Sequence, residues 1–148
     1  MAKLHTRLIE VVSRQRRKKM DCERWQVFSE EALKAIGKSG HEVSIAFVSD
    51  NQIRVLNQRF RGLGKATDVL SFPAGENPFT NSTHPRLGDI AISVERAESQ
   101  ALENRLAFED EVAQLILHGL LHLCGYDHET DEGQMNRLEL RLRKQLGI

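Results

Sequence analysis

The chain has 148 residues, and its 21 basic and 21 acidic side chains give a formal net charge of zero. Apolar residues make up 40% and charged residues 28%, which is typical of a folded domain and excludes a disordered or collagen-like chain. This length fits a single domain, residues 1–148, that buries roughly 70% of its unfolded surface, and the neutral balance gives no support to a nucleic-acid coat or an acidic tail.

The N-terminal part predicts a strand and then a helix. Aliphatic and β-branched residues favour a strand at 4–12, and the basic run at 14–19 that follows predicts an exposed turn or arm. That run either binds phosphates with low specificity or is a solvated face. Apolar residues then recur at helical spacing over 23–36, and Gly37 stands where a left-handed C-cap belongs.

A second strand and a second helix come next. Apolar residues alternate over 43–47, which is typical of a strand with one buried face. Ser49 and Gln52 have the form of a capping box, so a helix should begin there. Its apolar stripe stops around 61–64, where two glycines break the pattern. We therefore expect a loop after this helix.

The middle of the chain predicts two strands joined by a long loop. The strands are expected at 67–72 and 89–93, and all three prolines lie between them among Gly, Asn, Ser and Thr. We interpret 73–88 as a long, hairpin-like, Pro/Gly-rich loop.

Three helices complete the predicted order. Ser93 can cap a helix that runs to 106, a second should run from 108 to 124 and end at Gly125, and Asp131 can cap the last one. This order of elements predicts an α+β fold, in which a small mixed sheet of about four strands packs with about five helices.

The helix at 108–124 carries two histidines near its end. His118 and His122 are four residues apart, so both rings lie on one face and can reach one ion at about 2.0 to 2.1 Å. Gly125 adopts a positive φ at little cost, so the chain can turn back and bring His128 to the same ion. Three nitrogen ligands leave one coordination position open, so we predict a metal site at the end of a buried helix. Zinc is the first choice and another divalent transition metal the alternative.

Two other interpretations of these histidines are possible. A single histidine on a buried helix is more often a core residue bonded to a backbone carbonyl, but three at this spacing favour a metal, because buried imidazoles need partners. The three histidines and Gly125 also match the metallopeptidase pattern HExxHxxGxxH, except that Gly119 stands in place of the glutamate. Glycine cannot take a proton from water, so a metallopeptidase-like hydrolase is only an alternative.

Three blocks of the sequence resemble one known family. They are HGLLHLCGYDH at 118–128, LNQRFRGLGKATDVLSFP at 56–73 and LGDIAIS at 87–93, and they resemble the YbeY endoribonucleases, the bacterial rRNA maturation factors. The resemblance implies a zinc-dependent, single-strand-specific endoribonuclease that acts in maturation of the 16S rRNA 3′ end and in ribosome quality control. It implies three zinc ligands, His118, His122 and His128. The implied partners are single-stranded RNA, rRNA and the ribosome or ribosomal proteins.

The resemblance also implies a functional role for Arg61, which closes the LNxxFR part of its block and is expected in the glycine-flanked loop after the second helix. A guanidinium binds phosphate in a bidentate manner, so Arg61 is the predicted catalytic and substrate-binding side chain. Lys65 is a candidate contact to the RNA backbone. Asp68 and Asp127 are candidates to orient a ligand histidine through its second ring nitrogen, with loop capping as the equal alternative. The attacking oxygen comes either from water or from the ribose 2′-hydroxyl.

An RNA-binding module without catalysis is a further alternative. It lacks support from the aromatic residues, because Trp25 and four phenylalanines occur at the apolar spacings of their elements, where core packing outweighs base stacking. These phenylalanines are Phe28, Phe47, Phe60 and Phe72.

The sequence also indicates where in the cell the protein is located. The longest stretch without an acidic or basic residue, 112–126, is shorter than the roughly 20 residues that a membrane helix needs. Neither a signal peptide nor a disulfide framework is evident, and Cys22 and Cys124 are both expected to play no part in metal binding. We expect a cytoplasmic protein with no membrane association.

Overall fold

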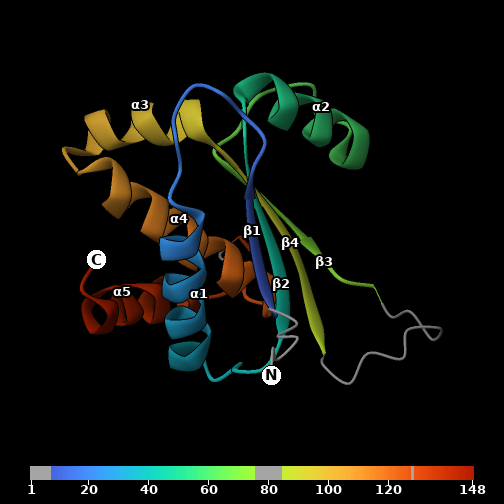
Figure 1. The fold of residues 1–148 in the computed structure, drawn as a ribbon. Helices are drawn as coiled ribbons and strands as arrows, with labels where there is room; N and C mark the ends of the chain where they lie inside the picture. Colours follow the sequence, from blue (N-terminus) through green and yellow to red (C-terminus); the bar gives the residue numbers. More distant parts are fainter. Residues whose placement is uncertain (1–7, 76–84, 128) are drawn as a thin grey trace, which may run out of the picture.

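A computed structural model of the chain, which describes residues 8–75, 85–127 and 129–148, contains one four-stranded sheet in the order β1-β2-β4-β3. The strands are β1 (Ile9–Ser13), β2 (Glu42–Val48), β3 (Val69–Pro73) and β4 (Arg86–Ser93). β1, β2 and β4 are parallel, and β3 pairs antiparallel with β4 at one edge (Figure 1). The predicted small mixed sheet is confirmed.

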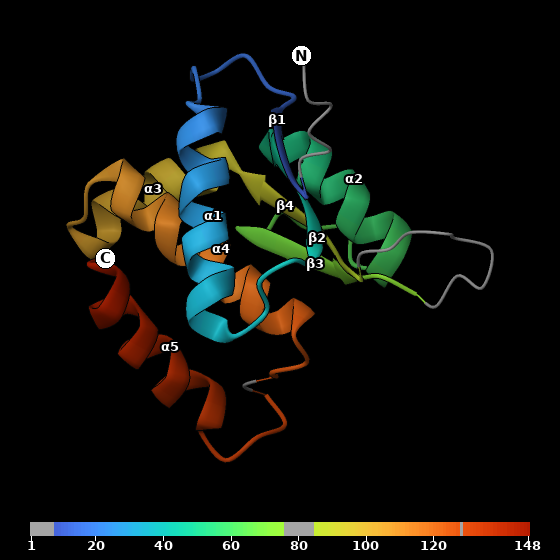
Figure 2. The same ribbon diagram turned by 60° about the horizontal axis from the view of Figure 1, so that its bottom comes forward.

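Five helices are present in the described part of the chain, as predicted. They are α1 (Cys22–Ile36), α2 (Asp50–Arg61), α3 (Val94–Asn104), α4 (Phe108–Leu123) and α5 (Gln134–Leu146). Helices α1, α4 and α5 lie on one side of the sheet, and α2 lies on the other side (Figures 1 and 2). The α+β assignment is confirmed.

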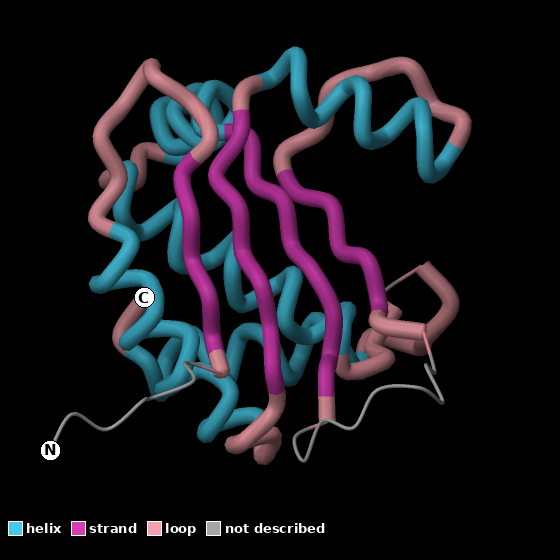
Figure 3. Tube along the Cα trace, turned by 45° about the vertical axis from the view of Figure 1, so that its right-hand side comes forward, coloured by secondary structure: helices cyan, strands magenta, loops and turns pink. Residues whose placement is uncertain are grey.

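The sheet faces differ because strand side chains alternate. One face carries Val43, Ile45 and Ile90 into the main core against α1, α4 and α5. The opposite face carries Leu70 and Ala91, which form a small second cluster with Val48 and with Ile53 of α2. Figure 3 views this face directly and shows α2 across its upper end only. Among the described residues, much of this face is therefore left without a covering helix.

Local capping signals explain where the early helices begin and end. The Asp21 side chain accepts from the Arg24 amide at the start of α1, and Gly37 closes this helix at φ +89°. At the start of α2, Ser49 and Gln52 form a capping box, in which the side chain of each residue accepts a hydrogen bond from the backbone amide of the other. The predicted caps at Gly37 and Ser49 are confirmed, because each depends only on neighbouring residues.

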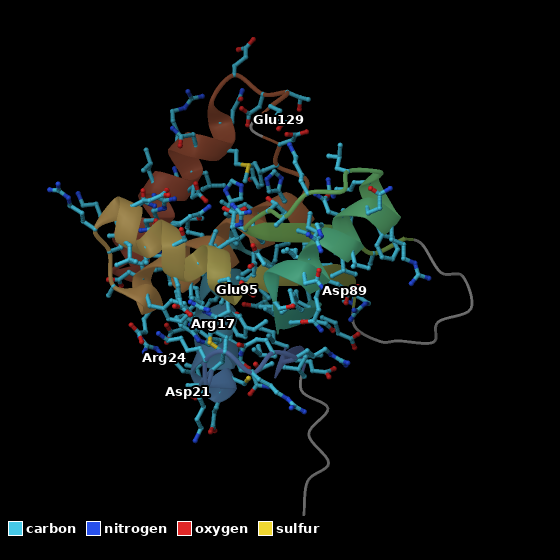
Figure 4. All side chains as sticks on the ribbon, turned by 90° about the horizontal axis from the view of Figure 1, so that it is seen from above. Arg17, Asp21, Arg24, Asp89, Glu95 and Glu129 are labelled. Atoms are coloured by element: carbon cyan, nitrogen blue, oxygen red, sulfur yellow. The ribbon has the colours of Figure 1, made fainter. Side chains whose placement is uncertain are left out.

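The basic run lies in the loop between β1 and α1, and this loop contacts α3 and α4. Arg17 Nε is 3.1 Å from Glu98 Oε1, and the Lys18 ammonium is 4.2 Å from the centroid of the Phe108 ring. Figure 4, which labels Arg17, shows this loop beside the body of the molecule. At least these two basic side chains are directed to protein partners.

The predicted loop at 73–88 is too long at both ends. Pro73 is the last residue of β3, and β4 begins at Arg86, where Glu42 of β2 is its strand partner. Gly88 pairs with Pro73 across the antiparallel ladder. Backbone pairing to two neighbouring strands extends β4 beyond its apolar residues, so the sequence pattern placed its start too late. The rest of the predicted loop, residues 76–84, lies outside the described residues.

No helix in the described ranges combines the length and the apolar character needed to cross a membrane.

Candidate functional site

Helix α4 places two histidines at the edge of the core. Most of its side chains are buried, whereas His118 and His122 are half-buried on one face. Their ring centroids are 4.6 Å apart with an interplanar angle of 78°, and their Nε2 atoms are 3.1 Å apart. The two Nε2 atoms therefore face each other across a short gap.

Glu139 of α5 forms a hydrogen bond with Nδ1, the other nitrogen of the His118 ring. Its Oε1 is 2.9 Å from His118 Nδ1, and Arg143 Nη2 is 3.4 Å from its Oε2. Burial alone raises the pKa of the Glu139 carboxyl, but the hydrogen bond to His118 and the positive charges of His118, Arg143 and His122 together lower this pKa below its ordinary value. The Glu139 carboxylate can only accept, so its hydrogen bond with His118 places the hydrogen on Nδ1 of that ring.

Glu139 was missed in the sequence, although a signal for it exists. It lies four residues after Met135 and three before Leu142, so it is an acid on the buried stripe of an amphipathic helix. A buried acid needs a partner, and the nearby histidine motif supplies one.

The geometry of the two described histidines fits a divalent transition metal. Two ligands of a tetrahedral zinc, each at 2.0 to 2.1 Å, lie about 3.4 Å from each other. The observed 3.1 Å between the two Nε2 atoms is close to this separation. The bond from Glu139 to Nδ1 leaves the Nε2 lone pair of His118 directed to the same gap. The two residues fit such an ion.

The predicted third ligand, His128, lies outside the described residues. Within the described residues, no group of three or more His, Cys, Asp or Glu side chains is arranged to hold a metal. The backbone before His128 fits the predicted turn, because Gly125 has φ +96° two residues after the end of α4. The three-histidine site therefore stays a prediction.

A cleft of about 650 Å³ contains the two described histidines, and we call it the histidine cleft. It lies between the end of α4, the loop after α2, and β3. It brings together all the described residues predicted for the site, which are Arg61, Lys65, Asp68, His118, His122 and Asp127.

Arg61 is the last residue of α2 rather than part of a loop, and this corrects the sequence interpretation. Gly62, at φ +69°, is the helix C-cap, so the helix runs one residue further than the glycine pair suggested. Arg61 Nη2 donates to the Ser71 carbonyl at 2.8 Å and is thereby fixed at the rim of the cleft. A guanidinium has five N–H groups, so this bond leaves others to donate to a ligand.

The remaining predicted residues form hydrogen bonds with residues close to them in the sequence. Asp68 Oδ1 accepts from the Val69 amide at 2.7 Å, and Asp127 Oδ1 accepts from the Glu129 amide at 3.0 Å. Figure 4 labels Glu129 on the loop that follows α4. The Lys65 side chain is exposed, while its carbonyl accepts from Asn57 Nδ2 at 2.9 Å. These bonds order the walls of the histidine cleft.

Gly119 packs against the sheet rather than facing the cleft. A Cβ atom at this position would lie 3.0 Å from Ile90 Cδ1 and 3.3 Å from Ser71 Oγ. Ser71 Oγ also donates to the Gly119 carbonyl at 3.3 Å. Any side chain at this position would push Ile90 and Ser71 aside, so glycine favours the close contact between α4 and the sheet.

A second pocket of about 520 Å³ adjoins the histidine cleft and shares Asp68 and His118 with it. Its lining includes Glu111 of α4, whose side chain accepts from Asn104 Nδ2 at 3.2 Å. Burial is the main cause that raises the pKa of Glu111, aided by the charge of Asp68 and opposed by the Asn104 bond and by Arg143. This carboxyl therefore holds its proton more tightly than a free glutamate.

The family model described as "Endoribonuclease YbeY" matches residues 10–147. Among curated proteins of that name, the one from Aquifex aeolicus (strain VF5) is 42% identical over 136 residues, covering 90% of this chain and 87% of its own. The one from Koribacter versatilis (strain Ellin345) is 45% identical over 122 residues, covering 82% and 75%. The one from Campylobacter fetus subsp. fetus (strain 82-40) is 43% identical over 107 residues, covering 72% and 76%.

A solved structure shows the same fold. The solution structure of TM1509 from Thermotoga maritima superposes with a TM-score of 0.63 at 27% sequence identity, and the match covers 93% of this chain and 88% of the other. The arrangement of sheet and helices described above is therefore similar to one determined by experiment.

Proposed function

Because the chain belongs to the endoribonuclease YbeY family and is an endoribonuclease, we propose that it cleaves single-stranded RNA in the histidine cleft. The proposal assigns one zinc ion to His118, His122 and His128. The observation that carries it is the pair of Nε2 atoms 3.1 Å apart in the same cleft as Arg61. A zinc ion held there supplies Lewis acidity at the scissile phosphate.

Arg61 is proposed to bind the scissile phosphate and to stabilise the negative charge that develops during cleavage. Its position supports this role, because the bond to the Ser71 carbonyl holds the guanidinium at the cleft rim before substrate arrives. Lys65 is proposed as a second contact to the RNA backbone, since its exposed side chain lies on the same cleft.

Glu139 is proposed as the residue that orients His118 for the metal, in the role first considered for Asp68 and Asp127. Its bond to Nδ1 supports this, because ligating histidines commonly donate their second N–H to a carboxylate. Asp68 and Asp127 are then proposed to act on the site indirectly, by ordering the loops that form the cleft walls.

The biological substrate proposed is rRNA, with action at the 16S 3′ end and in ribosome quality control, in the cytoplasm and with ribosomal proteins as partners. The support is the family of the chain and the resemblance of its three sequence blocks.

One experiment separates the proposed function from its alternatives. The purified chain is incubated with single-stranded RNA, duplex RNA and casein, with and without a chelator. We expect cleavage of single-stranded RNA alone and its loss with the chelator. Cleavage of casein would instead identify a peptidase, and binding of RNA without cleavage would identify a binding module.

Variants then assign the roles. His118→Ala and His122→Ala should each lose bound zinc and cleavage, while Arg61→Ala should keep zinc and lose roughly 10²- to 10³-fold in kcat, as on removal of an oxyanion donor. Arg54→Ala, on the exposed side of α2, is the matched control and should behave as wild type. Normal cleavage by Arg61→Ala would remove Arg61 from the mechanism.

A further inference from the structure

We infer that Phe60 and Phe72 form a stacking site for an RNA base next to the scissile phosphate. This inference rests on the proposed function and adds a binding site for the substrate outside the histidine cleft.

Phe60 is exposed, contrary to the core position expected from its helical spacing. Its relative exposure is 59%, and it belongs to neither cluster of buried apolar residues in the described structure. It lies in the last turn of α2, beyond the end of the small cluster that this helix covers. A large exposed aromatic side chain at the rim of an active site is a typical ligand contact.

The Phe60 ring is held in place from one side. It meets Phe72 of β3 edge to face, with centroids 5.2 Å apart and an interplanar angle of 61°. Phe72 is itself packed against the small cluster under α2. The pair therefore presents a supported aromatic surface, which a base can use at low entropic cost.

Two guanidinium groups accompany the two rings. Arg59 lies 5.5 Å from the Phe60 centroid and Arg61 lies 6.0 Å from the Phe72 centroid. Aromatic rings beside basic side chains are the usual composition of surfaces that bind single strands, since bases stack while cations contact the backbone. Arg61 already belongs to the histidine cleft, so the stacking surface begins where the proposed phosphate contact ends.

A groove of about 830 Å³ continues from the histidine cleft along the open sheet face and includes this aromatic pair. The groove and the cleft share three residues, Arg61, Ser71 and Pro73. Its lining includes the small side chains Ser44 and Ala46 of β2 and Ala91 of the small cluster. The basic Arg14 and the acidic Glu10 and Asp89 also line it. An RNA strand that leaves the cleft across β3 therefore enters a hollow with room beside the rings.

This site accounts for a preference for single strands. A base in a duplex is stacked on both neighbours and paired, so its faces are not available to Phe60. A base in a single strand can turn out onto the ring, and stacking tolerates any base because each has a π face. We therefore expect the aromatic pair to select unpaired RNA without selecting sequence.

The test is RNA binding, measured in chelator so that the strand stays intact. Single-stranded oligonucleotides are titrated with wild type, Phe60→Ala, Phe60→Trp and the control Val55→Ala. Val55 is on the same helix, is 57% exposed, and does not line the groove. We expect Phe60→Ala to weaken binding roughly 5- to 150-fold, the range for loss of one stacked base. Phe60→Trp should restore binding, and Val55→Ala should bind as wild type.

An abasic scan locates the base. The oligonucleotide is kept just long enough to fill the cleft and the groove, so that it cannot shift its register. One nucleotide at a time is replaced by an abasic residue, and one position should weaken binding to wild type as much as Phe60→Ala does. Phe60→Ala should lose nothing more at that position, because the two changes remove the same contact. Independent losses at every position, or a Phe60→Ala chain that binds as wild type, would overturn the inference. If wild type cleaves RNA in that case, the proposed function stands and only the stacking site fails. A wild type that neither binds nor cleaves RNA overturns both.

Discussion

Glu139 shows how one side chain far along the chain tunes a predicted ligand. It bonds Nδ1 of His118, while Nε2 of the same ring faces His122. Glu139→Gln keeps the size of the side chain but removes the charge that makes the ring a stronger donor. We expect zinc affinity to fall about 10- to 100-fold.

Competition with a chromophoric chelator measures this affinity. Glu103→Gln, an exposed acid on α3, is the matched control and should bind zinc as wild type. Equal affinities of Glu139→Gln and wild type would show that the carboxylate acts only in packing.

The raised pKa of Glu111 should make the unfolding free energy depend on pH. Its pKa is raised from 4.5 in the folded chain, mainly by burial, so its ionisation costs the folded state free energy. This cost is absent well below pH 4.5 and grows as the pH rises through the raised pKa. Glu111→Gln removes the charge and keeps an oxygen that can accept from Asn104.

We therefore expect Glu111→Gln to unfold at a higher urea concentration than wild type at pH 7, with the difference shrinking toward pH 4. Urea unfolding at both values measures it. A variant less stable than wild type at pH 7 would mean that the ionised carboxylate is favourably paired.

Contact between α4 and the sheet leaves little space for a side chain at position 119. A Cβ at this position meets Ile90 at 3.0 Å, so Gly119→Glu forces a charged side chain into a packed interface. We expect a loss of at least about 3 kcal/mol in unfolding free energy and no peptidase activity. Urea denaturation and a casein assay measure these.

Gly119→Ala is the graded control for that substitution, because it adds only the first atom of the side chain and should cost less. Wild-type stability of the glutamate variant would show that α4 can move away from the sheet and that the site has room for a base at 119.

Helix α2 contributes to both the small apolar cluster and the rim of the histidine cleft. Its Ile53 fills the small cluster, and its last turn carries Phe60 and Arg61 to the rim of the histidine cleft. The start of the helix is tied to α3, where Asp50 Oδ1 accepts from Ser93 Oγ at 2.8 Å and lies 3.2 Å from Arg96 Nε. Anchoring at one end fixes the direction in which the functional end projects.

The composition of the main core indicates how the folded chain should respond when zinc is removed. The main cluster joins β1, β2 and β4 to α1, α4 and α5 without using either described histidine. We expect the chelated chain to stay folded and to lose only cleavage. Zinc should raise the melting temperature, with about 2.7 kcal/mol of stabilisation when free zinc is 100 times its Kd.

Circular dichroism melting at several free zinc concentrations measures this shift, with His118→Ala as the control that should not respond. Unfolding on chelation would instead mark the ion as part of the framework of the fold.

Much of the fold is predictable because its signals are local. Gly37, Ser49 and Gln52 act through neighbouring residues, and alternation at 43–47 reports which strand face is buried. The pair His118 and His122 is likewise local, since helical spacing alone puts both rings on one face. The sequence therefore indicated the elements, the α+β class and the candidate metal site.

Other features depend on how the elements are arranged. Phe60 has helical apolar spacing, yet it is exposed, because α2 covers only one end of the sheet. Glu139 meets His118 only because α5 packs on α4. Spacing along one chain reports the face of one element, whereas the partner of that face is set by packing between elements distant in sequence. For that reason the sequence determined which residues are candidates for the site, and the tertiary structure decided what surrounds them and where the groove beside them runs.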